Sequence, residues 1–533
     1  MTTSIIVGSG PAAAGVALAL ASDRSQRVVV IDLGNRLDDE RSAAVERMAS
    51  STADAWRDDD LRLVRTQPVE SGRRGLPQKR SYGSDYPFQD VGQLAEVTAT
   101  SHANRNVVSG AYGGLSNIWG SQVMPFTPAT FSDWPVGYAE LEPHYRAILT
   151  AIPFAADDDA IARRFPLIVD GSPLPPLAPR STSVLDAFDL HRSHVEGKGV
   201  TMGRARLAFD ANRCIRCGLC MTGCPYGLIY SAAHTFDELR AAGRVEYLGG
   251  LQAIDIGQEG QTPYVVARDL ESGAHSRFEA DRLYVACGAV GTSRLVLQSL
   301  RVYDQDVSMA ESAQFVVPML SAKRTPDPLA TSEFTLNQFN MLVTLDEAWR
   351  DVSQIHFYPH NAAIADALPA PLRSGPGKPL GQQLLRRLTV GLGYLPSWES
   401  PQMRIRLAPP VSEGEPAGII ISGDEQAAGA NWMLRRVIRR MLQVAPALDL
   451  WPILPMTSLS APGKSYHFGG SLPHRSEAVD GPMTTDRLGR LRTWSRVHAV
   501  DASVFPTVPA TTFTLTIMAN AHRIAAEVLK EAS

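Results

Sequence analysis

Two kinds of hydrophobic pattern follow one another along the chain. In two places, residues 4–22 and 281–300, a short apolar run ends at a glycine and leads into a helix of small and apolar residues. Such a strand, turn and helix is typical of a parallel α/β layer. Elsewhere, runs with alternating or β-branched apolar residues read as strands of a mostly antiparallel sheet. Strands are predicted over 244–256, 264–270, 341–347, 352–359 and 401–410, an amphipathic helix over 431–445, and a strand, loop and closing helix over 497–533.

The N-terminal run carries a pattern with a chemical meaning. SIIV stops at Gly8, and the sequence G-x-G-x-x-A continues with Gly10 and Ala13. Gly8 permits a tight strand-to-helix turn, Gly10 leaves room for a pyrophosphate, and Ala13 lets the helix pack close to the sheet. The next strand ends at Asp32, which is placed to accept hydrogen bonds from ribose hydroxyls. This order predicts a dinucleotide site, with FAD and NAD both open, and an ordinary glycine-rich turn as the alternative.

Four of the five cysteines fall within CIRCGLCMTGCPYG, residues 214–227. Their spacing, C-x2-C-x2-C-x3-C-P, is that of the ferredoxin-type iron–sulfur run, and soft thiolates at these intervals can converge on one cluster. A structural zinc site is the alternative, although zinc sites usually pair two C-x2-C knuckles across a longer loop. The predicted cluster ligands are Cys214, Cys217, Cys220 and Cys224.

Composition and charge act mainly by excluding functions. The chain of 533 residues is 44% hydrophobic and 20% charged, and its net charge of −4 argues against nucleic acid as a partner. No run of eighteen apolar residues is present, so no membrane span is expected. The apolar N-terminus lacks a basic stretch and is interrupted by glycines, so we expect no signal peptide and a cytoplasmic location, although export with a partner stays open. Residues 37–90 are polar and charge-rich, and they predict a surface insertion, helical at first and irregular after that.

Several segments together resemble the glucose–methanol–choline (GMC) family of flavoprotein oxidoreductases, in particular its iron–sulfur-containing sugar and alcohol dehydrogenases. They keep the family's order: VGSGPAAAG, GGLSNIWG, WPVGYAELEPHY, CGAVGTSRLVLQS and HFGGS…VDASVFPTVP…TLTIMANAHRIA. The resemblance implies an α/β (α+β) fold with a Rossmann-like FAD-binding domain and a discontinuous substrate domain. The implied FAD-binding domain comprises 1–36, 91–130, 205–303 and 460–533, including the iron–sulfur loop 212–228, and the substrate domain comprises 131–204 and 304–459.

The resemblance also implies further FAD-binding residues. Some relatives attach FAD through a histidine in the second of these segments, but Asn117 and Ile118 stand there, so no covalent link is expected at that point. Cys287 falls where the family has a small residue beside the flavin, and it is expected to be a buried small side chain. The implied FAD-binding residues are Gly113, Gly114, Ser116, Asn117, Gly288, Asp501 and Ala502.

A hydride leaves an alcohol carbon readily only if a base removes the hydroxyl proton, and that base is usually histidine. His467 in SYHFGGS matches the family's active-site histidine. The family's second position, a histidine or asparagine, falls on Thr512, which can hydrogen-bond a substrate oxygen but cannot serve as a base at neutral pH. His474 is the alternative for this position. His356 and His360 are expected to line the substrate side.

The cluster and the flavin together indicate the function. Some relatives hold a three-iron cluster with a C-x5-C-x3-C-P-x-G pattern, and the additional Cys217 favours [4Fe–4S] over [3Fe–4S] here. A flavin accepts two electrons at once, whereas an iron–sulfur cluster passes one at a time. The sequence therefore predicts an FAD-dependent dehydrogenase that oxidises a small alcohol or sugar and passes electrons singly to a ferredoxin, cytochrome or quinone. A reductase with the same wiring, a non-catalytic electron-transfer protein and an oxidase are the alternatives.

Overall fold

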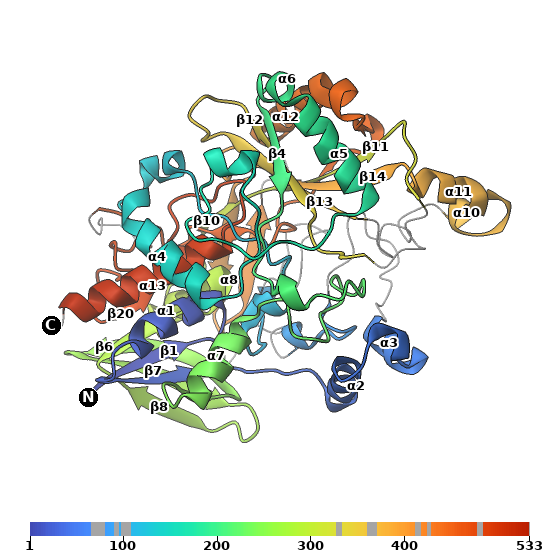
Figure 1. The fold of residues 1–533 in the computed structure, drawn as a ribbon. Coiled ribbons are helices and arrows are strands. Elements are labelled where there is room, and N and C mark those ends of the chain that lie inside the picture. The colour runs from blue at the N-terminus through green and yellow to red at the C-terminus, as the bar shows by residue number, and fades with distance from the viewer. Residues whose placement is uncertain are drawn as a thin grey trace.

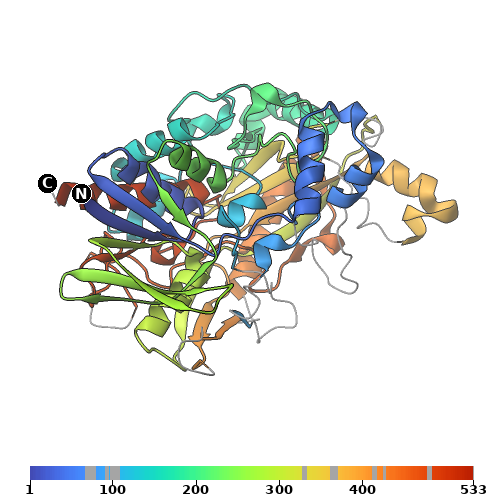
Figure 2. The same ribbon diagram turned by 90° about the horizontal axis from the view of Figure 1, so that it is seen from below.

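The structure is a computed structural model. It has a parallel α/β half, which holds both chain ends on one side of the molecule, and an antiparallel half (Figures 1 and 2). None of the helices within the described ranges is long and apolar enough to span a bilayer. The residues described are 1–65, 80–89, 95–96, 108–326, 333–359, 370–410, 417–423, 428–476 and 483–531.

A five-stranded parallel sheet forms the centre of the first half, in the order β20-β9-β1-β2-β5. The last four residues of both β1 and β2 are buried, as expected for a parallel sheet covered on both faces. Helix α1 follows β1, and its Gly15 lies so close to the Met518 carbonyl of α13 that any side chain would overlap it. The bounds are β1 Thr2–Val7, α1 Pro11–Ala21, β2 Gln26–Ile31, β5 Glu246–Leu248, β9 Arg282–Val285, β20 Val497–Ala499 and α13 Thr514–Glu531.

The connection from β5 to β9 is a separate antiparallel sheet of β6, β7 and β8. The single strand predicted over 244–256 is divided at Gly249 and Gly250 into β5, which joins the parallel sheet, and β6. After β9 the chain enters α8, so the second predicted strand, turn and helix is also present. The bounds are β6 Leu251–Glu259, β7 Thr262–Asp269, β8 His275–Glu279, α8 Gly288–Ser299 and, before this region, α7 Ala232–Ala241.

The second half is built on an antiparallel sheet in the order β17-β11-β14-β13-β12-β4, with β18 paired to β11. One face of this sheet packs on α5 and α12 through a continuous hydrophobic core (Figure 1). Helices α10 and α11 project from its edge (Figures 1 and 2). The bounds are β4 Val200–Arg204, β11 Gln314–Leu320, β12 Phe339–Thr344, β13 Val352–Tyr358, β14 Leu388–Tyr394, β17 Trp451–Pro452, β18 Ser458–Leu459, α5 Pro179–Leu190, α6 Arg192–Glu196, α10 Ala370–Arg373, α11 Lys378–Leu385 and α12 Ala428–Leu448.

A third sheet, β19-β10-β15-β16-β3, joins the two halves. Its buried residues Val307, Ile405 and Ile419 belong to the core of the parallel half, although they lie in the predicted substrate domain. Tyr145 of α4 belongs to the same core and hydrogen-bonds Thr516 of α13 at 2.9 Å. The core of the parallel half thus reaches past the predicted boundaries, and the division into two domains stays a prediction. The bounds are β3 Ala95–Glu96, α4 Tyr138–Ala151, β10 Val307–Glu311, β15 Met403–Leu407, β16 Ile419–Gly423 and β19 Phe468–Gly469.

The described part of the 37–90 insertion is more regular than expected. Helix α2 (Asp39–Ala49) matches the helical prediction, but α3 (Asp58–Arg65) lies where the sequence predicted irregular chain. The α3 helix forms because three acids occupy its first turn and two arginines its last, which complements the helix dipole. The buried residues of the two helices pack against the cysteine loop, so the insertion covers that loop on one side. The insertion's residues 66–79 and 90 lie outside the described part.

Candidate functional site

The turn after β1 has the geometry expected of an anion-binding helix start. Gly8 adopts a φ of +100°, and a Cβ there would lie 2.6 Å from the Ala286 carbonyl oxygen. Gly10 is the N-cap of α1 and has no side chain to cap the helix, and a Cβ placed on it would meet no atom within 4 Å. The start of α1 therefore leaves space beside Gly10, as a pyrophosphate bound at a helix N-terminus requires. Ala13 is fully buried within α1, as predicted for close packing on the sheet.

Asp32 directly follows β2 and is partly buried. Its carboxylate accepts hydrogen bonds from the hydroxyl of Ser9 and from that of Tyr247, the latter at 2.9 Å. Burial raises the pKa of Asp32 to about 6, and these hydrogen bonds oppose the rise. The carboxylate is thus fixed beside the glycine turn, where the sequence predicted a ribose contact.

The glycine segment near Trp119 packs directly on this turn. The Gly113 amide donates to Ser9 Oγ at 2.9 Å, and a Cβ on Gly114 would lie 3.0 Å from the Gly10 Cα. Both glycines have positive φ, which the close approach of two backbones requires. The predicted flavin contacts Gly113 and Gly114 are therefore neighbours of the dinucleotide turn.

Ser116 and Asn117 hold the segment in shape. Ser116 Oγ donates to the Gly113 carbonyl at 2.5 Å and accepts from the Ala232 amide at 2.9 Å. Asn117 Nδ2 donates to the Gly114 carbonyl at 2.8 Å, and its Oδ1 accepts from Ser231 Oγ at 3.1 Å. Their polar side-chain atoms are directed at the protein, so their part in cofactor binding stays a prediction.

Gly288, Asp501 and Ala502 gather at the carboxyl ends of β9 and β20. Gly288 begins α8 with a φ of +77°, and a Cβ on it would have no atom within 4 Å. Asp501 is buried, accepts from Thr292 Oγ1 and from the Ser503 amide, and has a pKa raised by burial. The Ala502 carbonyl accepts from the Gly470 amide at 2.9 Å. Because the carboxyl ends of parallel strands form the ligand edge of such sheets, these residues lie where a dinucleotide is expected.

The cysteine loop follows the 3₁₀ turn Ala211–Arg213 and is wound through four residues with positive φ. Backbone amides donate to several sulfurs: the Arg216 amide to Cys214 Sγ at 3.4 Å, and further amides to Cys217 and Cys224. Burial raises the pKa of the Cys214 thiol to about 11 and that of Cys217 to about 12. The residues with positive φ are Arg216, Gly218, Gly223 and Gly227.

These features fit an iron–sulfur cluster. N–H···S hydrogen bonds are a common feature of thiolates in such clusters, and a bound metal removes the protons that burial otherwise retains. Within the described chain, no three metal-ligating side chains gather tightly enough to hold a single ion. In an iron–sulfur cluster each thiolate binds a different iron. The cysteine sulfurs therefore lie farther apart than four sulfurs that share one zinc ion through bonds of about 2.3 Å.

The insertion closes one side of the loop. Tyr82 donates from its hydroxyl to the Cys224 carbonyl at 2.7 Å, and its ring lies where a Cβ on Gly223 would sit 2.6 Å away. Tyr226 donates to the Ser51 carbonyl at 2.8 Å and stacks on Trp56. The sequence did not indicate this contact, because the two partners are separated by more than a hundred residues.

His467 lies in a loop that is fixed by a buried acid. The Glu311 carboxylate accepts from the Gly463 and Ser465 amides at 3.0 and 3.2 Å, and burial raises its pKa. The Ser312 amide donates to the His467 carbonyl at 3.0 Å. The imidazole ring stacks on Tyr394 with centroids 4.2 Å apart and an interplanar angle of 13°, and it also contacts Phe513. The backbone and ring of His467 are therefore both held in place.

Two buried polar atoms of this region have no partner among the described residues. Nδ1 of His467 and the hydroxyl oxygen of Thr512 are buried without a hydrogen bond to any described residue. Burial and the neighbouring His356 lower the pKa of His467 to about 3, so its imidazole is neutral at physiological pH. A neutral, oriented imidazole beside unsatisfied polar atoms can accept a proton from a ligand hydroxyl. The His467 ring contacts Phe513, the residue after Thr512, so the structure brings these two segments together, and the catalytic roles of His467 and Thr512 stay a prediction.

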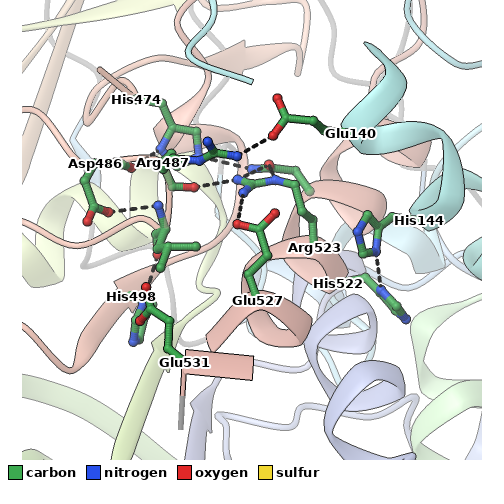
Figure 3. A network of polar contacts seen from close by, with 12 residues as sticks. Glu140, His144, His474, Asp486, Arg487, His498, His522, Arg523, Glu527 and Glu531 are labelled. Atoms are coloured by element: carbon green, nitrogen blue, oxygen red, sulfur yellow. Dashed lines mark hydrogen bonds and ion pairs between the residues drawn. The ribbon is translucent and has the colours of Figure 1, made fainter. Parts of the chain in front are cut away.

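His474 is engaged elsewhere. Its Nδ1 lies 2.6 Å from the Asp486 carbonyl and 3.1 Å from Thr485 Oγ1, and its Nε2 lies 3.2 Å from Asn520 Nδ2 (Figure 3). Asn520 in turn accepts from the fully buried Arg523, so His474 belongs to a structural network under α13. Both ring nitrogens are occupied, which favours Thr512 over His474 at the second position.

Two residues of this site were not predicted from the sequence. Tyr394 ends β14 and stacks on His467, and Gln354 of β13 accepts from the Thr512 amide at 3.0 Å. The buried polar residues on alternate positions of the β13 strand were the available signal. His356 is on the same strand and was expected to line the substrate side, whereas His360 lies outside the described residues.

Comparison with known proteins agrees with this architecture. Residues 207–229 match the protein family described as "4Fe-4S binding domain". Among solved structures, pyridoxine 4-oxidase from Mesorbium loti is similar over 99% of both chains, with a TM-score of 0.62 and 15% sequence identity. No curated protein matches the chain by sequence.

The structural match defines the class of fold. The chain has the fold of pyridoxine 4-oxidase over its full length, combined with a 4Fe–4S motif. The predicted fold, a Rossmann-like parallel sheet beside a mostly antiparallel one, is confirmed. The resemblance to the GMC flavoprotein oxidoreductases is supported at the level of the fold.

Proposed function

We propose that this protein is an FAD-dependent dehydrogenase that oxidises an alcohol or sugar hydroxyl and exports the electrons one at a time through a [4Fe–4S] cluster. The observation that carries the proposal is the short connection between the two candidate cofactor sites. Ser231 follows Cys224 by seven residues and hydrogen-bonds Asn117 in the glycine segment that packs on the dinucleotide turn. The backbone therefore runs directly from the cysteine loop to the cradle of the proposed flavin.

The dinucleotide cradle has the features that FAD needs. Gly10 and the uncapped start of α1 would hold the pyrophosphate, and Asp32 would accept from the ribose. Gly113, Gly114 and Gly288 allow the backbone to approach the cofactor. When bound there, the flavin would accept the hydride from the carbon that carries the hydroxyl.

His467 would act as the base. Its neutral imidazole can take the hydroxyl proton, and its stacking on Tyr394 fixes the ring plane against which the substrate is oriented. The Thr512 hydroxyl has no partner among the described residues and would hydrogen-bond the substrate oxygen. Substrate positioning and proton removal would thus come from two different segments of the chain.

The four loop cysteines would hold the cluster, and the loop offers an exit for electrons. Ile215, between the first two cysteines, is 47% exposed, and its neighbours Arg213 and Arg216 are exposed as well. An apolar side chain with basic neighbours, directly at the ligands, is a suitable contact for an electron acceptor. The acceptor would be a ferredoxin, a cytochrome or a quinone.

An oxidase is the second candidate, because the structurally similar protein is itself named a pyridoxine oxidase. In that case electrons would pass from the flavin to O₂, and hydrogen peroxide would form in proportion to product. A relay without chemistry of its own would leave the flavin unchanged by any alcohol, whereas a reductase that runs in the opposite direction would reoxidise its reduced flavin with a carbonyl compound.

The proposal is tested on anaerobically purified protein. Iron and sulfide analysis with EPR spectroscopy should give four irons and a [4Fe–4S] signal on reduction. The protein should then be mixed without oxygen with pyridoxine, benzyl alcohol, glucose and related neutral hydroxyl compounds. Bleaching of the flavin by one of them, followed by the cluster signal, supports the dehydrogenase. Zinc in the loop, or bleaching by reduced electron carriers alone, would refute it.

A further inference from the structure

The antiparallel sheet turns one face toward the segment that carries His467. Ile355 and Phe357 of β13 pack in the core against α5 and α12, so Gln354, His356 and Tyr358 point to the opposite face. The hydrogen bond from the Thr512 amide to Gln354 Oε1 shows that this opposite face meets the C-terminal segment.

His356 is buried on this face without a partner for one ring nitrogen. The residue is 5% exposed, and its Nε2 has no hydrogen bond to any described residue. Its ring centroid lies 5.5 Å from that of Tyr394, and the Tyr394 ring also stacks on the His467 ring with centroids 4.2 Å apart. The two imidazoles therefore flank one tyrosine, although they come from the sheet and from the C-terminal loop.

Several unsatisfied polar atoms belong to the segments that meet here, because the His467 ring contacts Phe513 and the Thr512 amide donates to Gln354. Nε2 of His356, Nδ1 of His467 and the hydroxyl oxygens of Thr511 and Thr512 are all buried without partners among the described residues. Each such atom costs about 1–3 kcal/mol when it is left unpaired. Native proteins rarely accept several of these costs in one place unless a ligand satisfies the atoms.

We propose that His356 is a second catalytic histidine, which donates a hydrogen bond from Nε2 to the substrate oxygen while His467 removes the hydroxyl proton. This inference rests on the proposed oxidation of a hydroxyl group. In that step the O–H bond breaks and its proton goes to His467, the C–H bond breaks and its electron pair leaves as hydride to the oxidised flavin, and a C=O double bond forms. The hydrogen bond from His356 stabilises the negative charge that develops on the oxygen.

The sheet face around His356 also restricts the substrate. In the pairing of the strands, His356 lies in one row with Val316, Leu392, Asn340 and Gly203. Val316 and Leu392 are only partly buried, so apolar surface is available beside the histidine. On β4, β11, β12, β13 and β14, this face carries no charged residue. The part of the substrate that meets the sheet is therefore uncharged.

A crystal structure of the holoenzyme without substrate provides the first test. We expect an ordered water oxygen within hydrogen-bond distance of His356 Nε2 and of the His467 ring, at the place of the substrate oxygen. If His356 Nε2 is instead bonded to a protein atom, or faces a dry apolar space, the residue is structural and the proposal is wrong. This readout needs neither an identified substrate nor turnover.

Two variants provide the second test. With the hydroxyl compound that bleaches the flavin best, His356→Leu should lower the rate constant of flavin reduction by about 100-fold, the size of effect known for loss of one oxyanion donor. His356→Asn retains an N–H donor and should recover part of the rate. Leu and Asn variants that are equally slow, or as fast as wild type, would contradict the role.

The tests separate this inference from the proposed function. If no hydroxyl compound reduces the flavin, the dehydrogenase proposal fails. A water bound by both histidines would then no longer mark the position of a substrate hydroxyl, and the catalytic role of His356 would fail with it. If reduction is rapid in wild type and in both variants, the dehydrogenase stands and only the role of His356 is refuted.

Discussion

The cysteine loop and the histidine site differ in how the chain assembles them. The four cysteines lie within eleven consecutive residues, from Cys214 to Cys224, and their geometry is set by local backbone turns and N–H···S hydrogen bonds. The site around His467 draws on β13, β14 and the C-terminal segment, and it depends on stacked rings and orphaned polar atoms. The cysteine loop is a local motif that the 37–90 insertion covers on one side. The histidine site forms only after the two halves of the molecule have packed.

The largest effect is expected at the histidine site. His467→Ala removes the proposed base, and the rate constant of flavin reduction by alcohol should fall by about 100- to 10,000-fold. Stopped-flow absorbance measures this rate directly. His275→Ala, an exposed histidine on β8, is the control and should change nothing. An unchanged rate in His467→Ala would contradict the role of His467 as the base.

A cysteine substitution should disrupt the cluster site and leave the flavin and histidine sites intact. Cys220→Ser removes the most deeply buried ligand, and the cluster EPR signal should fall by about tenfold or more, while flavin content and flavin reduction are retained. Cys287→Ser is the matched control, because Cys287 lies beside the dinucleotide turn and outside the loop. Equal iron content in both variants would mean that the loop is not the cluster site.

Alanine substitutions at two glycines of the dinucleotide turn should distinguish a loss of FAD affinity from a loss of thermal stability. Gly10→Ala meets no protein atom, so we expect unchanged thermal stability and an FAD affinity lower by about tenfold or more. Gly8→Ala combines a positive φ with a close carbonyl oxygen, so it should lower the unfolding temperature as well. Fluorescence titration with FAD and calorimetry provide the readouts. Normal FAD affinity in Gly10→Ala would contradict the pyrophosphate assignment.

Substitutions at the contact between the 37–90 insertion and the cysteine loop should have a smaller effect on cluster retention. Tyr82→Phe removes one hydrogen bond to the Cys224 carbonyl and should cost about 1 kcal/mol, which corresponds to about fivefold faster loss of iron to a chelator. Tyr226→Phe, which loses a bond to Ser51, tests the other contact of the insertion in the same assay. Iron loss at the wild-type rate in both variants would show that the cover has no role in retention.

The smallest effect is expected from pH. Burial and His356 lower the pKa of His467 to about 3, so the proposed base stays unprotonated when the pH falls through the usual histidine range. Flavin reduction should therefore change by less than about twofold between about pH 5.5 and about pH 8. A steep loss of rate near pH 6.5 would indicate a solvated histidine with an ordinary pKa.

The sequence predicted the cysteine ligands and the glycine turns because local spacing and backbone conformation are written in neighbouring residues. It also predicted His467, but only through resemblance. The contacts of Tyr394 and Gln354 could not be predicted, because they depend on the register of β13 and β14 and on the packing of the C-terminal segment. The same reason explains why α3 and Tyr82 were not expected to cover the cysteine loop.

We propose that an alcohol reduces a flavin that passes its electrons to a cluster in the same chain. Anaerobic addition of the active hydroxyl compound, followed by parallel absorbance and freeze-quench EPR measurements, tests this electron path. We expect the flavin to bleach first and the [4Fe–4S] signal then to rise at a rate fast enough for turnover. A bleached flavin beside a cluster that stays oxidised, with hydrogen peroxide formed once air is admitted, would contradict it.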